Sequence, residues 1–481
     1  MKNHRKIWKK ACLAGMLLTM SGGTAVSGES LSTVTEEAQI LPIPDGSGCY
    51  LLKSDGFYCL KANGSRDGAP GIHYFDHLVI DGTLFDGYYY HDETGRFSAH
   101  APEMAYIKKL AAPVREEEPQ LVFDGFYMVG NLGKLSAAPQ VRYMDGLSLN
   151  GVSLQGYYYF NENGRLVQEA GIHEVRMDSR GRHFDGHYYF GGPDGLLSEE
   201  GGVTADGLVY DEEGRVENME EEGREGLLSR LEAMTAAYEG EWSIYVKDLG
   251  KGKDMEILIN DRPLCSASLI KLFVMEATYH NGQDVKSSLG LRLKADTESD
   301  PVAGRLGTLL TNMITVSDNE SFNELVRLQT EDYHFALGAR RINRYLRTQG
   351  YEDTAVLHTL APSSSTPVGI GENNQTSAKD CGRLLERIYR GRCVSREASE
   401  AMEELLLAQR VTTKIPQPLG GEVKVANKTG ETDTDQHDVA IVYGEKTDYI
   451  LCVLSENCPK KETAIENIRN ISRVVYEYLN Q

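Results

Sequence analysis

The stretch "CSASLIKLFVMEATYH", residues 265–280, decides how the C-terminal half of this sequence is interpreted. Within it Ser268 precedes Lys271 by three residues, and an apolar run follows. Side chains three residues apart at the start of a helix project from the same face, which brings the amine toward the hydroxyl. Burial behind the apolar run would lower the pKa of the lysine toward the neutral amine that a base requires. Taken alone, the string fits an ordinary helix end equally well.

Two further strings support the interpretation of the first string as part of an active site. "TVSDNES" contains Ser317, Asp318 and Asn319, and "VANKTGET" contains Lys428 followed by Thr429 and Gly430 on a strand-like segment. The three strings occur in the order and rough spacing typical of penicillin-recognising serine enzymes. A serine with a buried amine, a second serine beside an amide and a cationic strand edge favour acyl transfer to an anionic substrate. The sequence has no Gly-rich phosphate loop that would indicate phosphoryl transfer instead.

Residues 225–481 resemble the class A β-lactamases on the strength of these three strings. The resemblance implies that Ser268 is the acylated nucleophile and Lys271 its base. It also implies that Ser317 passes a proton to the leaving nitrogen and that Asn319 binds the side-chain amide of the substrate.

The same resemblance implies an anion-binding strand and an oxyanion hole. Lys428, Thr429 and Gly430 would hold the substrate carboxylate, with the lysine supplying charge and the threonine a hydroxyl. The backbone N–H groups of Ser268 and Glu431 would form the oxyanion hole. The resemblance implies no cofactor and no metal ion.

The loop between the second and third strings departs from the family pattern. Class A enzymes deacylate through a water held by a glutamate, and aligning "QTSAKD" places that residue near Leu360 or Ala361, where no carboxylate stands. Glu372 is the nearest later acid and would serve in deacylation if the loop is rebuilt; otherwise it is a surface residue. Without a deacylating base, acylation through Lys271 would leave a long-lived acyl-enzyme.

Other reactive side chains near these strings have simpler interpretations. His437 and Asp438 invite a triad with some serine, but "HDVAIVYG" reads as a strand that enters the core, which favours a structural hydrogen bond for Asp438. Cys265 is expected to pack at the start of the helix rather than to react.

The pattern of elements predicts an α/β sandwich for residues 227–481. A helical segment is followed by the strand-like "WSIYVKDL", then by a long helical middle, and finally by "EVKVANKTG", "HDVAIVYG", "DYILCVLS" and a terminal helix. We therefore expect an antiparallel sheet built from both ends of the domain, with a helical insertion.

Residues 44–216 repeat a short motif, as in "FDGYYYHDETGRF" and "LQGYYYFNENGRLV". The residue before each glycine falls at 55, 86, 124, 155, 185 and 206, with steps of 31, 38, 31, 30 and 21. Such spacing predicts an all-β array of hairpins whose polar turns use Asn and Gly. The motif resembles tyrosine-rich cell-wall-binding and glucan-binding repeats, which implies a wall polysaccharide as partner. Alternatively, the paired tyrosines only build the core of the array.

The remaining features concern export and partners. Residues 1–27 combine a basic start with a short apolar stretch, which predicts a signal peptide; the stretch is about half the roughly 20 residues of a membrane span. Residues 217–226 predict an acidic linker. A net charge of -21 disfavours nucleic acid and anionic lipid as partners. The seven cysteines after residue 27 form neither a disulfide framework nor a compact zinc motif, so no metal site is predicted.

The sequence as a whole predicts a secreted, cell-wall-associated serine hydrolase that acts on a β-lactam or a related amide, a function associated with antibiotic resistance. Two alternatives use the same residues. A peptidoglycan D-alanyl-D-alanine peptidase is acylated through the same three strings and needs no fast deacylation. A non-catalytic wall-binding protein could use the fold as a β-lactam sensor.

Overall fold

The computed structural model describes residues 39–480 except 44–48, 54–55, 81, 98–102, 113–120, 137, 218–222, 251–254 and 361–368. The predicted signal peptide lies outside these residues. The chain forms two compact units, Met1–Pro139 with Phe160–Leu166, and Gln140–Tyr159 with Val167–Gln481. In the part of the chain that is described, none of the helices has both the length and the apolar character needed to cross a membrane.

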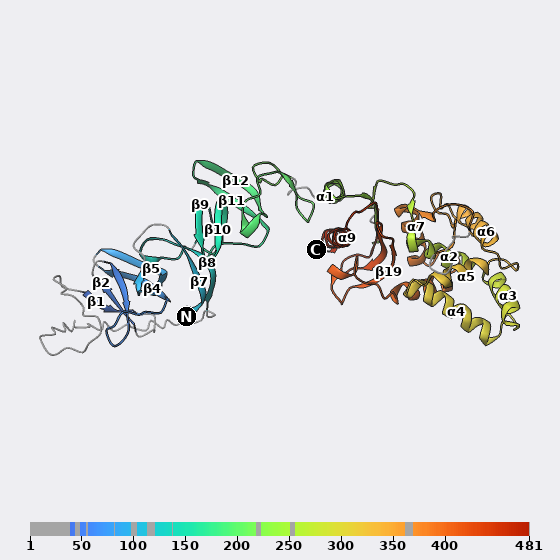
Figure 1. Cartoon of the computed structure of the whole chain (residues 1–481), viewed down its shortest axis with the longest axis horizontal. Coiled ribbons are helices and arrows are strands. Elements are labelled where there is room, and N and C mark those ends of the chain that lie inside the picture. Colours follow the sequence, from blue (N-terminus) through green and yellow to red (C-terminus); the bar gives the residue numbers. More distant parts are fainter. Residues whose placement is uncertain are drawn as a thin grey trace, which may run out of the picture. The chain divides into compact units, whose positions relative to one another are not determined.

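The first unit is built from β-strands around a six-stranded sheet in the order β1-β2-β3-β6-β5-β4 (Figure 1). Its strands are β1 (Gln39–Pro42), β2 (Tyr50–Lys53), β3 (Phe57–Leu60), β4 (Gly71–Ile80), β5 (Thr83–His91), β6 (Arg96–Phe97), β7 (Glu103–Ala111) and β8 (Val122–Val129), with a short 3-10 helix η1 (Asn131–Gly133). Phe75, Phe85 and Phe97 are fully buried between these strands and form the centre of a small aromatic core.

The second unit begins with further antiparallel hairpins. Their elements are β9 (Gln140–Leu149), β10 (Val152–Phe160), β11 (Gly171–Ser179), β12 (Arg182–Phe190), η2 (Pro193–Gly195), β13 (Gly202–Val203) and β14 (Val209–Tyr210). The long hairpins close through two-residue turns, and Asn150 and Gly151 have the positive φ angles, 48° and 78°, that such turns require. The N-terminal region is therefore rich in β-hairpins.

The pairing within these hairpins differs from the expectation. We expected each aromatic strand to fold back through the polar turn that follows it. Instead, each aromatic strand pairs along its length with the segment that precedes it, as β12 does with β11 from Ser179↔Arg182 to Gly171↔Phe190. The polar turn after the strand closes only a short bridge, such as Phe160↔Leu166. The longer ladder prevails because it satisfies many more backbone groups.

One arrangement recurs along the hairpins. A buried tyrosine in the aromatic strand accepts a hydrogen bond from the backbone N–H three residues earlier, as Tyr89 does from Asp86 (3.2 Å) and Tyr188 from Asp185 (3.3 Å). The tyrosines at the predicted paired positions therefore divide into two kinds. Tyr89, Tyr158 and Tyr188 are buried, whereas Tyr88, Tyr159 and Tyr189 are half-buried.

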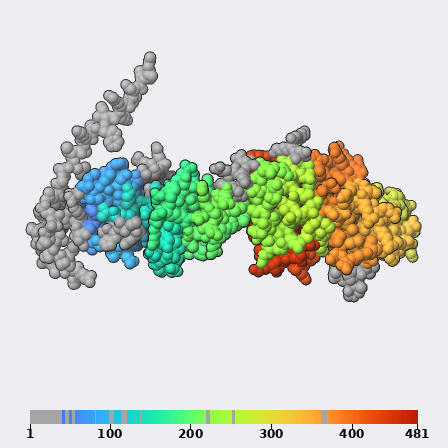
Figure 2. All heavy atoms as spheres, turned by 90° about the horizontal axis from the view of Figure 1, so that it is seen from above, coloured from blue at the N-terminus to red at the C-terminus, as the bar shows by residue number. Residues whose placement is uncertain are grey.

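The C-terminal part of the second unit contains the expected antiparallel sheet, in the order β16-β15-β21-β20-β19. Its strands come from both ends of this part: β15 (Glu241–Asp248), β16 (Glu256–Ile259), β19 (Lys424–Glu431), β20 (Gln436–Tyr443) and β21 (Tyr449–Glu456). The first strand, β15, consequently pairs with the last strand, β21, and the yellow-green and red surfaces adjoin in Figure 2.

Alternating side chains of this sheet serve two separate cores. On β21, for example, Leu451 and Val453 pack with the helices on one face, while Cys452 and Leu454 pack with those on the other. This is the period of two that a sheet covered on both faces requires. The first face carries the terminal helices α1 (Gly223–Ala237) and α9 (Lys461–Asn480), and the second carries the helical insertion (Figure 1).

The helical insertion lies between β16 and β19. Its elements are β17 (Leu264–Cys265), η3 (Ala267–Leu269), α2 (Ile270–His280), α3 (Gly282–Leu293), α4 (Asp300–Thr315), α5 (Asn319–Arg327), α6 (Phe335–Thr348), β18 (Gln375–Thr376), α7 (Ala378–Tyr389), α8 (Arg396–Leu407) and η4 (Gln417–Leu419). The predicted α/β sandwich with a helical insertion is thus confirmed. Helix α1 begins at Gly223, within the segment predicted as linker and four residues before the predicted domain start at 227.

Candidate active site

Ser268 lies where the chain turns from strand into helix. The two-residue strand β17 pairs with β18, and η3 then leads directly into α2. Ala267, immediately before the serine, has a φ of 42°, a left-handed conformation that is unfavourable for a residue with a Cβ. The surrounding structure holds this turn and leaves Ser268 half-buried at the start of a fully buried helix.

The Lys271 amine contacts four polar groups of the site. It lies 2.9 Å from Ser268 Oγ and 3.0 Å from Ser317 Oγ. It also lies 2.5 Å from the Ser317 carbonyl and 2.6 Å from the Asn319 side-chain oxygen. The lysine itself is fully buried. The structure therefore brings together four of the residues that the sequence strings predicted.

Burial, together with the nearby charge of Lys428, lowers the pKa of Lys271 from 10.5 to about 6. The amine is therefore mostly neutral at pH 7. A neutral amine has two hydrogens and one lone pair. Two of its four partners are carbonyl-type oxygens that only accept, and the other two are hydroxyls that can donate. Lys271 can thus donate both hydrogens to the oxygens of Ser317 and Asn319 and still accept a proton from Ser268.

The second string is a tight corner between α4 and α5. Ser317 has a φ of 58°, the second left-handed non-glycine residue in the site. Asp318 caps α5 by accepting a hydrogen bond from the Ser321 N–H at 2.6 Å. Burial acts to raise the pKa of Asp318, but the hydrogen bonds from Ser321 outweigh it and the pKa is lowered. The cap fixes the corner so that Ser317 and Asn319 both face Lys271.

Lys428 reaches the same corner from the edge of the sheet. Its amine donates to Ser317 Oγ at 2.9 Å and to the Thr429 carbonyl at 2.8 Å. Burial lowers its pKa to about 7. Ser317 Oγ thus stands between two lysine amines, one on α2 and one on β19, and forms a short path for a proton between them.

Strand β19 runs close beside the turn that carries Ser268. A Cβ at Gly430 would stand 3.1 Å from the Ser266 carbonyl and 3.2 Å from Leu269 Cγ, so only glycine permits this approach without displacement. The close contact explains in physical terms why a glycine follows Lys428 and Thr429. It also brings the backbone of Glu431 to the side of η3.

The backbone of Glu431 is oriented for the predicted oxyanion hole. Thr432 N–H donates to the Asp435 carbonyl at 3.1 Å, so the next pair along the ladder, Glu431 and Gln436, is a non-hydrogen-bonded pair. The Glu431 N–H therefore points away from β20, toward the open edge of the sheet where η3 lies. The Glu431 carboxylate pairs with Lys414 (3.1 Å) and Lys461 (2.9 Å).

Lys414 is a buried cation that sequence reasoning missed. Its amine contacts the carbonyls of Gly430 (3.4 Å) and His437 (3.1 Å) as well as the Glu431 carboxylate. The residue lies in "VTTKIPQPLG", where no periodicity or motif singles out the lysine. Only the fold shows that it supports the strand bearing Lys428.

His437 and Asp438 have structural roles. His437 Nδ1 accepts a hydrogen bond from Ser455 N–H (3.1 Å), so Nε2 carries the proton and donates to the Cys265 carbonyl (2.9 Å). Burial lowers the pKa of His437 to about 4. Asp438 accepts from the Ile415 N–H and the Asn427 amide, as a structural carboxylate does. Cys265 is half-buried at the start of the turn that carries Ser268.

The loop that should carry a deacylating glutamate is tied to the site by two asparagines. Asn323 on α5 binds both backbone groups of Leu360, at 3.0 and 2.9 Å. Asn374 accepts from the N–H of Leu357 and of His358. The half-buried Leu360 side chain packs against the insertion core. Of the two positions expected for the glutamate, the first therefore carries the apolar Leu360, and the second, Ala361, lies outside the described residues.

Glu372 is an exposed residue in a bend between that loop and β18. Its neighbour Asn374 is buried and contacts the loop, whereas Glu372 itself faces solvent in this arrangement. A role for Glu372 in deacylation stays a prediction.

The fold and the four clustered side chains define a serine–lysine site on an α/β sandwich, and a comparison with family models agrees with that class. The model described as the β-lactamase enzyme family matches residues 226–479, more than half of the chain. The chain belongs to the β-lactamase enzyme family.

Comparison with solved structures gives low sequence identities. The chain is similar to PBP-A (19% identity, TM-score 0.43, covering 52% of this chain and 94% of that one). It is also similar to a β-lactamase from Sphaerobacter thermophilus (19%, 0.39, 53% and 95%) and to the TLA-3 extended-spectrum β-lactamase (15%, 0.43, 54% and 100%). A search of curated proteins found no match.

Proposed function

We propose that the chain is a secreted serine hydrolase in which Ser268 is acylated by a β-lactam or a related peptide-like amide. The observation that carries the proposal is the set of contacts around Lys271: a nucleophile hydroxyl at 2.9 Å, a second hydroxyl at 3.0 Å, and burial that keeps the amine mostly neutral. A surface helix end would give none of these three features.

Acylation follows from this geometry. Lys271 accepts the Ser268 proton as the oxygen attacks the amide carbon, and the developing oxyanion meets the backbone N–H groups of Ser268 and Glu431. When the carbon–nitrogen bond breaks, the leaving nitrogen takes a proton from Ser317. The Lys271 ammonium then returns its proton to Ser317, which balances the step.

Lys428 favours an anionic substrate. Its pKa is lowered to about 7 by burial, and a bound carboxylate would stabilise its charged form. Thr429 follows Lys428 on β19 and would supply a hydroxyl as the second carboxylate contact. A β-lactam and the C-terminus of a peptidoglycan stem peptide both present such a carboxylate next to an amide.

Deacylation is the slow half of the reaction in this proposal. Water attack on the acyl group needs a base, and the position tied to Asn323 carries Leu360. This observation favours the second candidate function, a D-alanyl-D-alanine peptidase, over a fast β-lactamase. A non-catalytic sensor of β-lactams shares the acylation step and differs only in lacking turnover.

We further propose that the protein is exported and that its hairpins form a repeat array that holds it at the cell wall. Tyr88, Tyr159 and Tyr189 are half-buried and also contact rings inside the hairpins, Tyr159 stacking on His173 with centroids 3.9 Å apart, so only the exposed part of each ring would meet a wall polysaccharide. Sedimentation of the full chain with isolated cell walls tests this; failure to sediment would exclude anchoring by this region.

The experiment that tests acylation is intact-mass spectrometry after incubation with benzylpenicillin, followed by peptide mapping. The proposal expects one added penicilloyl group per chain, located on Ser268. A mass increase that persists in Ser268→Ala, or that maps to another residue, would overturn the assignment. Release of D-alanine from a stem-peptide mimic would then distinguish the peptidase from the sensor.

A further inference from the structure

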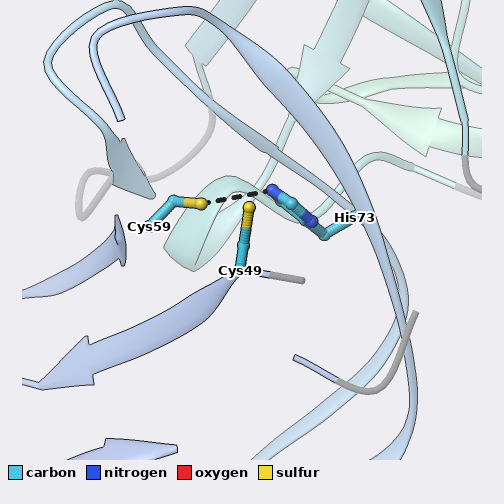
Figure 3. A group of neighbouring side chains, drawn as sticks. All are labelled: Cys49, Cys59 and His73. Atoms are coloured by element: carbon cyan, nitrogen blue, oxygen red, sulfur yellow. Dashed lines mark hydrogen bonds between the residues drawn. The ribbon is translucent and has the colours of Figure 1, made fainter. Parts of the chain in front are cut away.

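Three potential metal ligands converge in the first unit, remote in sequence from the serine strings. The sulfur atoms of Cys49 and Cys59 and a ring nitrogen of His73 all lie within 4.8 Å of one another. Cys59 Sγ is 3.4 Å from His73 Nε2. Figure 3 shows the three side chains pointing toward a common centre from β3, from β4 and from the residue before β2.

The curvature of the sheet produces this cluster. Cys49 directly precedes β2, Cys59 lies on β3 and His73 on β4. Strands β3 and β4 are separated in the sheet by β6 and β5, so the sheet must curl for Cys59 to reach His73. The spacing of the three residues along the chain is too wide for a recognisable motif, which is why the sequence predicted no metal site.

The cluster is largely shielded from solvent. Cys59 is fully buried, His73 is 4% exposed and Cys49 is half-buried. A half-buried thiol on an otherwise closed cluster leaves one side through which an ion can enter. Two sulfurs and an imidazole are a donor set that selects zinc-type ions over magnesium or calcium.

A second group adjoins the first and shares Cys59. His91, on β5, is 1% exposed and stacks on His73, with ring centroids 5.1 Å apart. Its Nδ1 lies 3.2 Å from the Asp92 carbonyl, which leaves Nε2 as the electron-pair donor. A Cβ on Gly71 would stand 2.4 Å from that nitrogen, so the glycine keeps Nε2 uncovered. Asp67, His91 and Cys59 also have ligand atoms within 4.8 Å of one another.

A disulfide between the two cysteines is the competing use of the thiols. Leu51 pairs with Cys59 in the ladder, so continuing the register places Cys49 opposite residue 61 and diagonal to Cys59. Diagonal neighbours have Cα atoms about 7–8 Å apart, beyond the span of about 4.4–6.8 Å that a disulfide covers. A metal ion bridges the longer separation because it lies between the sulfurs.

We propose that Cys49, Cys59 and His73 bind one Zn²⁺ ion, with an exchangeable fourth ligand on the side of Asp67 and His91. Binding displaces the protons of both thiols, which leave to solvent, and the imidazole binds in its neutral form. The ion ties β2, β3 and β4 together in a sheet whose apolar core is small. Its role is to stabilise the first unit, independently of the reaction at Ser268.

The experiment uses the full chain, reduced and stripped of metal with a chelator, then titrated with Zn²⁺ or with Co²⁺ as a spectroscopic probe. We expect one Zn²⁺ per chain after gel filtration. The Co²⁺ form should show sulfur-to-metal charge-transfer absorption and tetrahedral ligand-field bands. Zn²⁺ should also raise the melting temperature of the first unit by about 5 °C or more.

Variants locate the site. Cys59→Ser and His73→Gln should each weaken Zn²⁺ binding by about 10-fold or more. In the Co²⁺ form, Cys59→Ser should reduce the sulfur charge-transfer band, because one of the two thiolates is lost. His73→Gln should keep the band, because both thiolates remain, but should change the ligand-field bands. Cys49→Ser, at the half-buried position, tests the second sulfur with the least risk to folding. His77→Gln is the matched control, since His77 is an exposed residue on the same strand and forms a separate group with Asp76 and Asp86.

Near-UV circular dichroism of each variant, compared with the parent, reports whether the tertiary packing of the chain is kept. Loss of metal from the folded Cys49→Ser protein, with retention in His77→Gln, supports the proposal. Retention of stoichiometric Zn²⁺ by Cys59→Ser, equal loss from His77→Gln, or absence of binding to the folded parent overturns it. A Cys49–Cys59 disulfide in the secreted protein, found by peptide mapping without reduction, also overturns it.

Discussion

Replacement of Lys271 by methionine is the most informative change at the proposed site. With an ordinary pKa of 10.5 only about 0.03% of a lysine is neutral at pH 7, whereas a pKa of about 6 makes about 90% neutral, a gain of about 3,000-fold in available base. Methionine keeps the length and apolar character of the side chain but removes the proton acceptor. General-base catalysis contributes about 10²–10⁴-fold. We therefore expect acylation to slow by about 10³-fold.

The assay is the second-order rate constant for labelling by a fluorescent penicillin, read from gels over a concentration series at pH 7. Lys379→Met is the control, because Lys379 is a half-buried lysine on α7 whose amine pairs with Asp261 at 3.4 Å. It should label at the parent rate. If Lys271→Met is folded and labels within about 10-fold of the parent, Lys271 is not the base and the interpretation of its contacts is wrong.

Three further changes test other parts of the site. Acylation should rise as the pH increases through about 6, where Lys271 loses its proton, and fall above about 7 as Lys428 loses its charge; a flat labelling rate from pH 5 to 9 would contradict both roles. Because burial lowers the pKa of His437 from 6.5 to about 4, the unfolded chain binds a proton between these values that the folded chain does not. Stability should therefore fall as the pH drops from 6.5 to 4, by up to about 3 kcal/mol, and denaturant unfolding of His437→Gln should show a smaller loss; an equal loss would exclude His437 as its source. Leu360→Glu should shorten the lifetime of the acyl-enzyme at least 10-fold, measured by release of label, and an unchanged lifetime in the folded variant would show that this position does not serve deacylation.

The parts of the fold that the sequence predicted are those specified by local patterns. The continuous apolar runs of β20, β21 and α2 are readable without tertiary information. The three serine-enzyme strings are equally local, since each lies at the end of one element. Ser268, Lys271 and Ser317 could therefore be named before their distances were known.

The hairpin pairing could not be read in the same way. Each aromatic strand could pair either with the segment before it or with the segment after the polar turn. The choice depends on how many backbone hydrogen bonds each pairing forms. The turn at Asn150 and Gly151, with its positive φ angles, decides it in favour of the preceding segment. The Asn-Gly dipeptide between β-forming runs is typical of a two-residue turn. By itself, however, it does not exclude pairing through the later polar turn.

The supporting residues of the sites depend on contacts between distant segments. Lys414 meets Glu431 only because a loop crosses the edge of the sheet, and Asn323 meets Leu360 only through the packing of α5. His73 reaches Cys59 through the curl of a six-stranded sheet. Side chains of these types occur throughout the sequence, so only the fold distinguishes these particular residues.

The most direct test of the central claim follows fluorescent penicillin label and chromogenic cephalosporin turnover in one sample of the purified protein. We predict that one label attaches per chain, that it depends on Ser268, and that it persists while cephalosporin turnover stays slow. Rapid turnover with only transient label would contradict slow deacylation at the position of Leu360. Labelling that is unchanged in Ser268→Ala would contradict the assignment of the nucleophile itself.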